Sequence, residues 1–258
     1  VKEPRTGLSM GESTEIIAKD YAISRHDQDT LATESHAKAS RAYDEGFYKD
    51  LVVPFEGVEK DNIIRHDSTI QKLASLKTVF DKGVNATLTP GNSTSLTDGS
   101  AAVLLASDEW ANKNNLDIES YITSFEIAAV NYIDNEGLLM APAYAVSEML
   151  KKQNLNLQDF DFYEIHEAFA AQTLATINAW KSEEFCKSKL GREKVMGSFD
   201  HNKLNVKGGS LAIGHPFAAT GARIVATLSK LLKDNGGGKG LISICTAGGM
   251  GITAILER

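Results

Sequence analysis

The sequence is poor in cysteine and has no long apolar run. Its two cysteines, Cys186 and Cys245, are too few to cross-link a small secreted fold, which favours a reducing compartment. The longest buried-looking apolar stretch, residues 101–106, has the length of a strand, whereas a membrane-spanning helix needs roughly 18 consecutive apolar residues. The sequence therefore excludes a disulfide-stapled domain and an integral membrane protein.

Positive charge is also scarce. The 258 residues include 27 lysines and arginines against 34 aspartates and glutamates, and the net charge is -7. No basic stripe is present that could neutralise phosphates, so nucleic acid is excluded as a partner. A chain of this length forms one large domain or two smaller ones, and it can bury roughly three quarters of its unfolded surface.

Charged residues are concentrated before Pro90. Residues 1–90 contain 27 of them and residues 91–258 contain 34, so the first segment is expected to form solvated helices and loops. Ser24, with Asp27 three residues later, resembles a helix N-cap, and Gly46 suits a helix end, which predicts one helix over 24–45. Residues 51–90 lack sustained periodicity and predict mostly loop.

Strand-like and helix-like segments alternate after Pro90. The apolar pattern predicts strands over 100–106, 121–130, 161–165, 240–245 and 252–256, and helices over 108–114, 142–152, 167–180 and 220–233. Ser107 and Thr220 are expected to cap two of these helices, and Pro142 to occupy the first turn of a third. This alternation predicts an α/β fold in which helices cover a sheet.

Two glycine-rich loops carry the candidate chemistry. Residues 208–216 contain His215 before a proline, and residues 245–251 begin with Cys245 at the end of an apolar strand. His166 also follows a strand, and ligands in α/β sheets collect beyond the carboxyl ends of strands. The simpler alternatives remain open: tight turns for the glycines, a helix-capping His166, a satisfied loop histidine at 215 and a small buried hydrophobe at 245.

Metal and phosphate motifs are incomplete. His166-Glu167 is similar to the start of a zinc-protease signature, but position 170 is Ala and the required second histidine is absent. The glycine run 236–240 follows a helix and precedes a strand, the reverse of the order in a phosphate-binding loop. We therefore expect no metal site.

Several segments together resemble the thiolase family in order and spacing. These segments are His166-Glu167-Ala168-Phe169-Ala170, the glycine-rich run 205–216 followed by Thr220-Gly221-Ala222-Arg223, the run 245–251, the stretch 10–29 and the stretch 90–103. The resemblance covers nearly the whole chain. At the positions of His166 and Ala218, biosynthetic members of the family usually carry Asn and Gly. In these two residues the chain resembles instead the fatty-acid oxidation branch, whose members work beside a hydratase/dehydrogenase subunit.

This resemblance implies two similar α/β halves in layers and an inserted loop domain that covers coenzyme A. It places most of the loop domain at 1–90, the end of the first half at 91–116 and the second half at 117–258. The implied reaction cleaves a 3-ketoacyl-CoA with CoA, giving acetyl-CoA and a shortened acyl-CoA, or runs in reverse. CoA is then a substrate, and no permanently bound cofactor is expected. The implied assembly is a homo-oligomer in the bacterial cytoplasm or the mitochondrial matrix.

The cysteine that becomes acylated in thiolases has no counterpart in this sequence. In the family it lies upstream of the segments that match, and Cys186 lacks the glycine and serine surroundings of that motif. The chain also begins at Val1, without methionine and without an apolar signal core. We therefore expect a C-terminal piece of a longer enzyme, inactive by itself. A non-catalytic CoA-binding or scaffolding chain is the alternative.

The resemblance also implies residue roles. His215 lowers the pKa of the missing thiol, and Cys245 exchanges a proton with the acetyl-CoA enolate and with CoA, for which an ordinary thiol pKa of about 8.5 is suited. His166 holds a water for the enolate oxygen, and the Ala247 N–H serves a second oxyanion hole. The implied CoA contacts are Met10, Arg65, Phe80, Thr94, Ala168 and Phe169.

Overall fold

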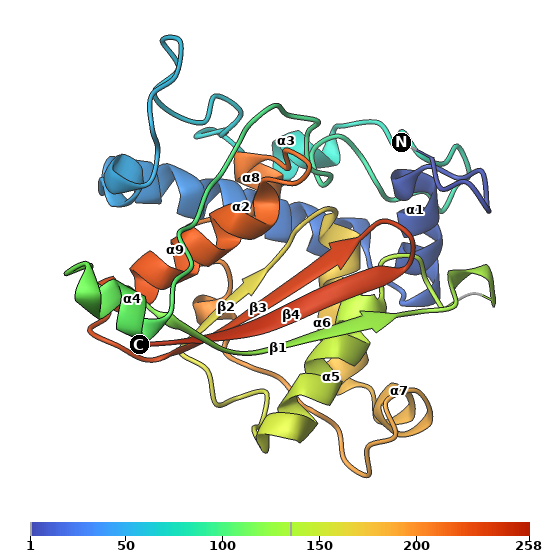
Figure 1. The fold of residues 1–258 in the computed structure, drawn as a ribbon. Helices are drawn as coiled ribbons and strands as arrows, with labels where there is room; N and C mark the ends of the chain where they lie inside the picture. The colour runs from blue at the N-terminus through green and yellow to red at the C-terminus, as the bar shows by residue number, and fades with distance from the viewer. Residues whose placement is uncertain (1, 135) are drawn as a thin grey trace.

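The computed structural model describes residues 2–134 and 136–258, and its centre is a four-stranded mixed sheet. The strands are β1 (Tyr121–Ala129), β2 (Phe162–Ile165), β3 (Lys239–Thr246) and β4 (Met250–Glu257), in the spatial order β1-β4-β3-β2 (Figure 1). β2 runs parallel to β3, and the other neighbouring pairs are antiparallel. The predicted α/β class is confirmed.

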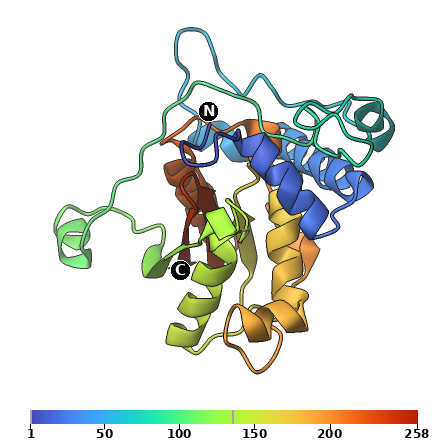
Figure 2. The same ribbon diagram turned by 90° about the vertical axis from the view of Figure 1, so that its right-hand side faces the viewer.

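Helices pack on both faces of this sheet. α5 (Ala141–Gln153) and α6 (Ala170–Lys181) lie side by side on one face (Figure 2), where their apolar side chains share the main core with β2, β3 and β4. α9 (Thr220–Asp234) covers β2 and β3 on the other face with Ile224, Leu228 and Leu232. Burying these stripes removes apolar surface from water, the largest favourable contribution to folding.

The N-terminal part lies across one end of the sheet. α1 (Met10–Asp20) packs against α6, and α2 (Arg25–Asp44) packs against α6 and the short helix α8 (Ser210–Ile213). The remaining short elements are α3 (Ile70–Ala74), α4 (Asp108–Lys113), α7 (Glu183–Ser188) and three 3-10 turns, at Phe47–Asp50, Tyr132–Asp134 and His201–Lys203. The prediction that residues 51–90 are mostly loop is confirmed.

Several helix boundaries follow from local signals in the sequence. Ser24 caps α2 by accepting a hydrogen bond from the Asp27 N–H, and Ser107 caps α4 in the same way. Pro142 occupies the first turn of α5, where a missing N–H costs nothing. The caps predicted at Ser24 and Ser107 and the predicted position of Pro142 are confirmed.

Two predicted helix starts are wrong. The helix predicted from residue 167 begins at Ala170, because Phe169 stays extended and pairs with Ser93. Thr220 is the first residue of α9 rather than its N-cap: Ala219 occupies the cap position without a side-chain hydrogen bond. The Thr220 hydroxyl contacts His215 instead, so a polar group that suits a cap is used in a tertiary contact.

The strand predicted over 100–106 is also wrong. These residues have no regular secondary structure and are exposed, with Leu104 at 74% and Leu105 at 68% exposure. Figure 2 shows this green trace running outside the layered body. A strand needs a neighbour for its backbone hydrogen bonds, and none lies beside this segment within residues 2–134 and 136–258.

No helix in the described part of the chain combines the length and apolar character needed to cross a bilayer.

Candidate active site

The candidate site lies beyond the carboxyl ends of the parallel strands β2 and β3. His166 directly follows β2, and its backbone N–H donates to the carbonyl oxygen of Ser243 on β3 at 2.9 Å. Cys245 is the second-last residue of the same strand β3. The parallel pairing therefore brings two of the predicted catalytic residues to neighbouring strand ends.

The third predicted catalytic residue joins them from a separate loop. The ring centroids of His166 and His215 are 4.3 Å apart, with 52° between the ring planes. The backbone N–H of His215 donates to Thr97 Oγ1 at 3.0 Å, which fixes the 214–217 loop against residues 94–99. The two histidines, 49 positions apart in the sequence, form one imidazole pair.

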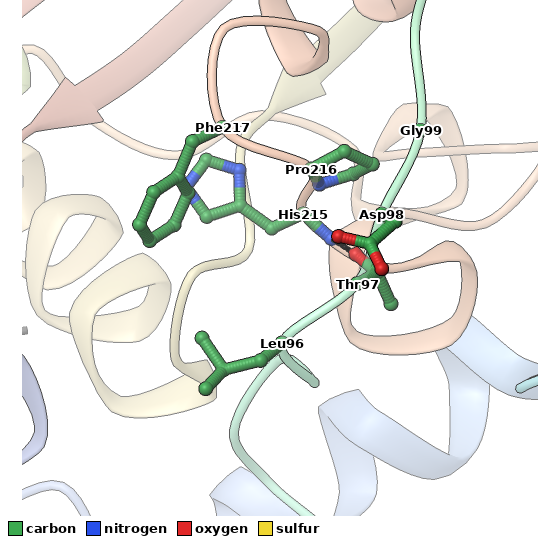
Figure 3. A pocket seen from close by; sticks show the side chains of 7 residues that line it. All are labelled: Leu96, Thr97, Asp98, Gly99, His215, Pro216 and Phe217. Carbon is green, nitrogen blue, oxygen red and sulfur yellow. Dashed lines mark hydrogen bonds between the residues drawn. The ribbon is translucent and has the colours of Figure 1, made fainter.

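His215 borders an open cavity of about 460 Å³. Figure 3 shows its lining residues: Leu96, Thr97, Asp98, Gly99, His215, Pro216 and Phe217. The rings of His215 and Phe217 lie together, with centroids 5.0 Å apart. His215 is half-buried at this cavity, whereas His166 behind it is 1% exposed. Of the two histidines, His215 lines this cavity and His166 does not.

Thr220 and Pro216 lie on one side of the His215 ring. Its Nδ1 is 2.7 Å from Thr220 Oγ1, and that hydroxyl is 3.3 Å from the Pro216 carbonyl oxygen. When the hydroxyl donates to this carbonyl, Nδ1–H is the donor in the shorter contact and Nε2 is left as an acceptor. Burial, and then the positive charge of Arg223, lower the pKa of His215, so the ring is a neutral base near pH 7.

His166 is held by Ser210 at the start of α8. The distance from His166 Nδ1 to Ser210 Oγ is 2.8 Å, and Arg223 Nη2 donates to the same hydroxyl at 2.8 Å. Burial lowers the pKa of His166 well below its ordinary value, and the charges of His215 and Arg223 act in the same direction. This imidazole is therefore also neutral.

A buried carboxylate holds the loops of the site together. Glu167 accepts hydrogen bonds from Ser35 Oγ (2.7 Å), Asn205 Nδ2 (2.6 Å) and the Leu211 N–H (3.3 Å). Gly209 is required beside it, because a Cβ there would lie 2.2 Å from Glu167 Oε2. α2, the loop before α8 and α8 itself thus share one acceptor just after β2, next to His166.

Cys245 is buried in the main apolar core, which also contains Ile165, Ala168 and Phe169. Burial raises the pKa of its thiol to about 12. The expectation of an ordinary thiol pKa is therefore wrong, since the strand end places the sulfur in apolar surroundings. Ala247 is exposed in the turn between β3 and β4, followed by Gly248 and Gly249 with positive φ.

Four of the six residues predicted to contact CoA, Phe80, Thr94, Ala168 and Phe169, are connected by direct contacts or by the chain itself, and Met10 packs against the same apolar core. The Phe80 and Phe169 rings meet edge to face at 5.9 Å, and Gly11, next to Met10, lies against Phe80. The Thr94 N–H donates to the Ala168 carbonyl at 3.0 Å. The Thr94 hydroxyl donates to the Ser210 carbonyl at 2.7 Å, so it also ties this loop to α8.

Arg65 is not part of this group. Its side chain is exposed, and its backbone N–H donates to His36 Nδ1 on α2 at 3.1 Å.

Ser35, Ser210 and Arg223 had no predicted role, and Thr220 was expected only to cap a helix, although Ser210, Thr220 and Arg223 lie in the segments that resemble thiolases. Glu167 and Asn205 were likewise part of the pattern without a role. One feature of the sequence could have indicated these residues: they are polar and stand inside otherwise apolar or glycine-rich segments. A polar side chain in such a segment is buried only if it has hydrogen-bond partners.

The chain is thus an α/β protein with a candidate site at the carboxyl ends of two parallel strands, where His166 follows β2, His215 packs against it and Cys245 lies near the end of β3. A model of the thiolase C-terminal domain matches residues 116–258, and a model of the thiolase N-terminal domain matches residues 1–109. The chain belongs to the thiolase family.

Curated relatives extend this similarity. The 3-ketoacyl-CoA thiolases of Shewanella loihica and Pseudoalteromonas translucida are each 44% identical to this chain over 263 residues. These alignments cover 100% of this chain and 60% of each relative, so the chain spans about three fifths of their length.

Solved structures show the same fold. The acetyl-CoA acetyltransferase of Bacillus anthracis superposes with a TM-score of 0.83 at 34% identity, covering 99% of this chain and 61% of that chain. Human mitochondrial 3-ketoacyl-CoA thiolase in complex with CoA superposes with a TM-score of 0.82 at 30% identity, covering 100% and 60%.

Proposed function

We propose that this chain is the part of a thiolase that supplies the proton-transfer groups and most of the CoA-covering surface. The whole enzyme cleaves a 3-ketoacyl-CoA with CoA to acetyl-CoA and an acyl-CoA shortened by two carbons, or catalyses the reverse condensation. The pairing of His166 and His215 at 4.3 Å, beyond strand ends that also carry Cys245, is the observation that supports this proposal most directly.

His215 acts as the base in this proposal. With its proton on Nδ1, its Nε2 can accept the proton of the attacking thiol and thus generate a thiolate beside the substrate. Cleavage of the carbon–carbon bond then releases an acetyl-CoA enolate, which must gain a proton at carbon. Cys245 donates it: a buried thiol with a pKa of about 12 remains protonated near pH 7 until a stronger base arrives.

Two oxyanions form during this sequence. His166, through a bound water, and His215, whose Nε2 now carries the proton taken from the thiol, serve the enolate oxygen, and the Ala247 N–H serves the thioester oxygen. Preorganised donors of this kind are worth roughly 2.7 to 4 kcal/mol each in related chemistry. The low pKa values of both histidines support this assignment, because neutral rings can hold fixed donor and acceptor positions.

The acyl-accepting cysteine is proposed to lie outside these 258 residues. Cys186 is buried on α7, where its Sγ is 3.4 Å from the Trp180 carbonyl, and Cys245 is assigned to proton transfer. The 258-residue chain is therefore expected to have no thiolytic activity by itself.

Met10, Phe80, Thr94, Ala168 and Phe169 are proposed to contact the pantetheine and thiol end of CoA, and Arg65 its nucleotide end. The contacts among Phe80, Thr94, Ala168 and Phe169 support a common surface, and the exposed side chain of Arg65 can meet a phosphate. We also propose the division into a loop domain at 1–90, the end of the first half at 91–116 and the second half at 117–258. The gap between the two family matches, residues 110–115, supports a boundary near 116.

The cellular role is proposed as fatty-acid β-oxidation in the bacterial cytoplasm or the mitochondrial matrix. The similarity to 3-ketoacyl-CoA thiolases supports the pathway. A homo-oligomer, with a hydratase/dehydrogenase subunit as a further partner, completes the proposal.

Chain fusion tests the reaction. The 258 residues are joined to the portion of the Shewanella loihica thiolase that they do not align with, and thiolysis of acetoacetyl-CoA is measured. We expect turnover in the fusion and none in the chain alone. In the fusion, Cys245→Ala should still accept an acyl group from an acyl-CoA but lose cleavage by at least about 100-fold, the scale of a general acid.

Two results would contradict the assignment. Thiolytic turnover by the isolated 258 residues would show that the nucleophile is within them. A Cys245→Ala fusion that cannot be acylated would show that Cys245 is the acceptor instead. CoA binding without turnover in the fusion would favour the scaffolding alternative.

A further inference from the structure

The second nitrogen of His166 has no partner. The ring is 1% exposed and its Nδ1 contacts Ser210, but Nε2 has no hydrogen-bond partner among residues 2–134 and 136–258. A buried polar nitrogen without a partner costs about 1 to 3 kcal/mol. Such a group in a candidate active site points to a ligand that completes it, and whether it donates or accepts depends on the tautomer of the ring.

The neighbours of Ser210 decide that tautomer. A guanidinium has only donors, so the 2.8 Å contact from Arg223 Nη2 makes Ser210 Oγ an acceptor. The other contact of this hydroxyl is His166 Nδ1, also at 2.8 Å. If Nδ1 carried a proton, the Ser210 hydroxyl would accept twice and its own hydrogen would be buried without an acceptor. If Nδ1 is bare, the Ser210 hydroxyl accepts from Arg223 Nη2 and donates to His166 Nδ1, so both of its contacts are satisfied.

We propose that Ser210 and Arg223 are positioning residues that fix His166 in the tautomer carrying its proton on Nε2. His166 then presents a buried N–H donor beside His215, which presents a bare nitrogen. The two rings are thus set in opposite tautomers by separate hydroxyls, Ser210 for one and Thr220 for the other. The role of this donor rests on the proposed function: it would hold the oxygen of a water or of an enolate.

Arg223 has a second effect on the pair. It projects from the first turn of α9, and its positive charge disfavours an imidazolium at both His166 and His215. Its Nε and Nη1 atoms are buried and have no hydrogen-bond partner within residues 2–134 and 136–258, so Nη2 alone ties the guanidinium to Ser210 there. A neutral His166 is necessary for the inference, because an imidazolium would donate from both nitrogens.

Nitrogen NMR of the 258-residue chain tests this inference. Histidine labelled with ¹⁵N gives separate signals for protonated and bare ring nitrogens, and His166→Asn and His215→Asn identify the two rings. At pH 7.5 we expect a bare Nδ1 and a protonated Nε2 for His166, and the opposite pattern for His215. Ser210→Ala should shift the His166 Nδ1 signal toward the protonated position, as the fixed tautomer gives way to a mixture.

A second variant covers the case in which Ser210→Ala does not fold. Arg223→Met removes the guanidinium donor and leaves the serine, and it should produce the same direction of shift at His166. Ser229→Ala is the matched control, because this buried serine lies six residues, about 1.7 turns, further along α9 than Arg223 and bonds Ser120 instead. It should leave both His166 signals in place.

The inference is overturned by a protonated Nδ1 on His166 in the unmodified chain, or by His166 signals that do not move in folded Ser210→Ala and Arg223→Met. Neither measurement uses CoA or turnover. A fusion that fails to cleave acetoacetyl-CoA would therefore contradict the proposed function and leave the tautomer intact, while a wrong tautomer would leave the reaction intact.

Discussion

The loop at residues 205–215 and the segment at residues 95–106 differ in a way that composition alone does not suggest. The first carries Asn205, Ser210 and His215, yet most of it is buried. The second is rich in apolar residues, yet Leu104 and Leu105 are exposed. Polar residues are thus inside and apolar residues outside, the reverse of the usual distribution.

The hydrogen-bond partners available to each segment explain why the polar loop is buried and the apolar segment is exposed. The polar loop finds its hydrogen bonds within the described chain, from Ser35, Glu167 and Arg223. Residues 100–106 of the apolar segment have no neighbouring strand there, so their backbone does not pair in a sheet and their side chains stay exposed. Burial therefore depends on available partners as well as on polarity.

Replacing Glu167, which holds the buried polar loop, should lower the free energy of unfolding more than any other substitution proposed below for the two segments. Glu167→Leu leaves the Ser35 hydroxyl, the Asn205 amide and the Leu211 N–H without their shared acceptor, so we expect a loss of about 3 to 5 kcal/mol in the free energy of unfolding. Urea denaturation measures it. The control is Glu148→Leu on the exposed side of α5, which should change stability by less than about 0.5 kcal/mol.

A loss below about 1 kcal/mol in Glu167→Leu would mean that the polar loop does not depend on this carboxylate. The contrast between the two regions would then rest on backbone packing instead of side-chain hydrogen bonds.

A methyl group at Gly209 tests the same contact from the other side. Gly209→Ala places a Cβ 2.2 Å from Glu167 Oε2, and overpacking of this kind costs about 1 to 3 kcal/mol. In a Glu167→Ala background the methyl has room, so the cost should fall by at least half. Gly221→Ala, which meets nothing within 4 Å, should be neutral or slightly stabilising. Equal costs in both backgrounds would contradict the contact.

Local signals account for what the sequence predicted well. Ser24, Ser107 and Pro142 act on backbone groups a few residues away, and their helices begin as expected. The placement of His166 beyond a strand end could also be predicted, because a strand followed by a helix puts that residue at the rim. The strand at 100–106 could not be judged from its own residues, since pairing depends on a neighbour elsewhere.

The site shows the same limit. Which residues become catalytic candidates followed from their motifs, but the tautomers depend on hydroxyls from other segments. Thr220 suited a helix cap by itself, and only the folded chain places its hydroxyl against His215. The pKa of Cys245 likewise depends on the apolar residues around it.

Glu164 provides a smaller, pH-dependent effect in the buried region. Burial raises the pKa of its carboxyl to about 8, so the folded state holds a proton that the unfolded state releases above about pH 4.5. Stability is therefore lost as pH rises through the folded pKa. Relative to Glu164→Gln, we expect the wild type to lose about 1 to 2 kcal/mol between pH 6.5 and 8.5. If the wild type and Glu164→Gln instead lost the same free energy of unfolding between pH 6.5 and 8.5, Glu164 would already be ionised in the folded protein.

The exposed segment should respond least to substitution. Leu104→Ser combined with Leu105→Ser removes apolar side chains that are already in water, so the free energy of unfolding should change by less than about 0.5 kcal/mol. Leu241→Ser is the matched control, because this leucine is 0% exposed on β3 and should cost about 3 kcal/mol or more. Urea denaturation of the 258-residue chain compares them. A loss above about 1 kcal/mol in the double variant would mean that residues 100–106 are packed in solution, and that the contrast between the two regions is wrong.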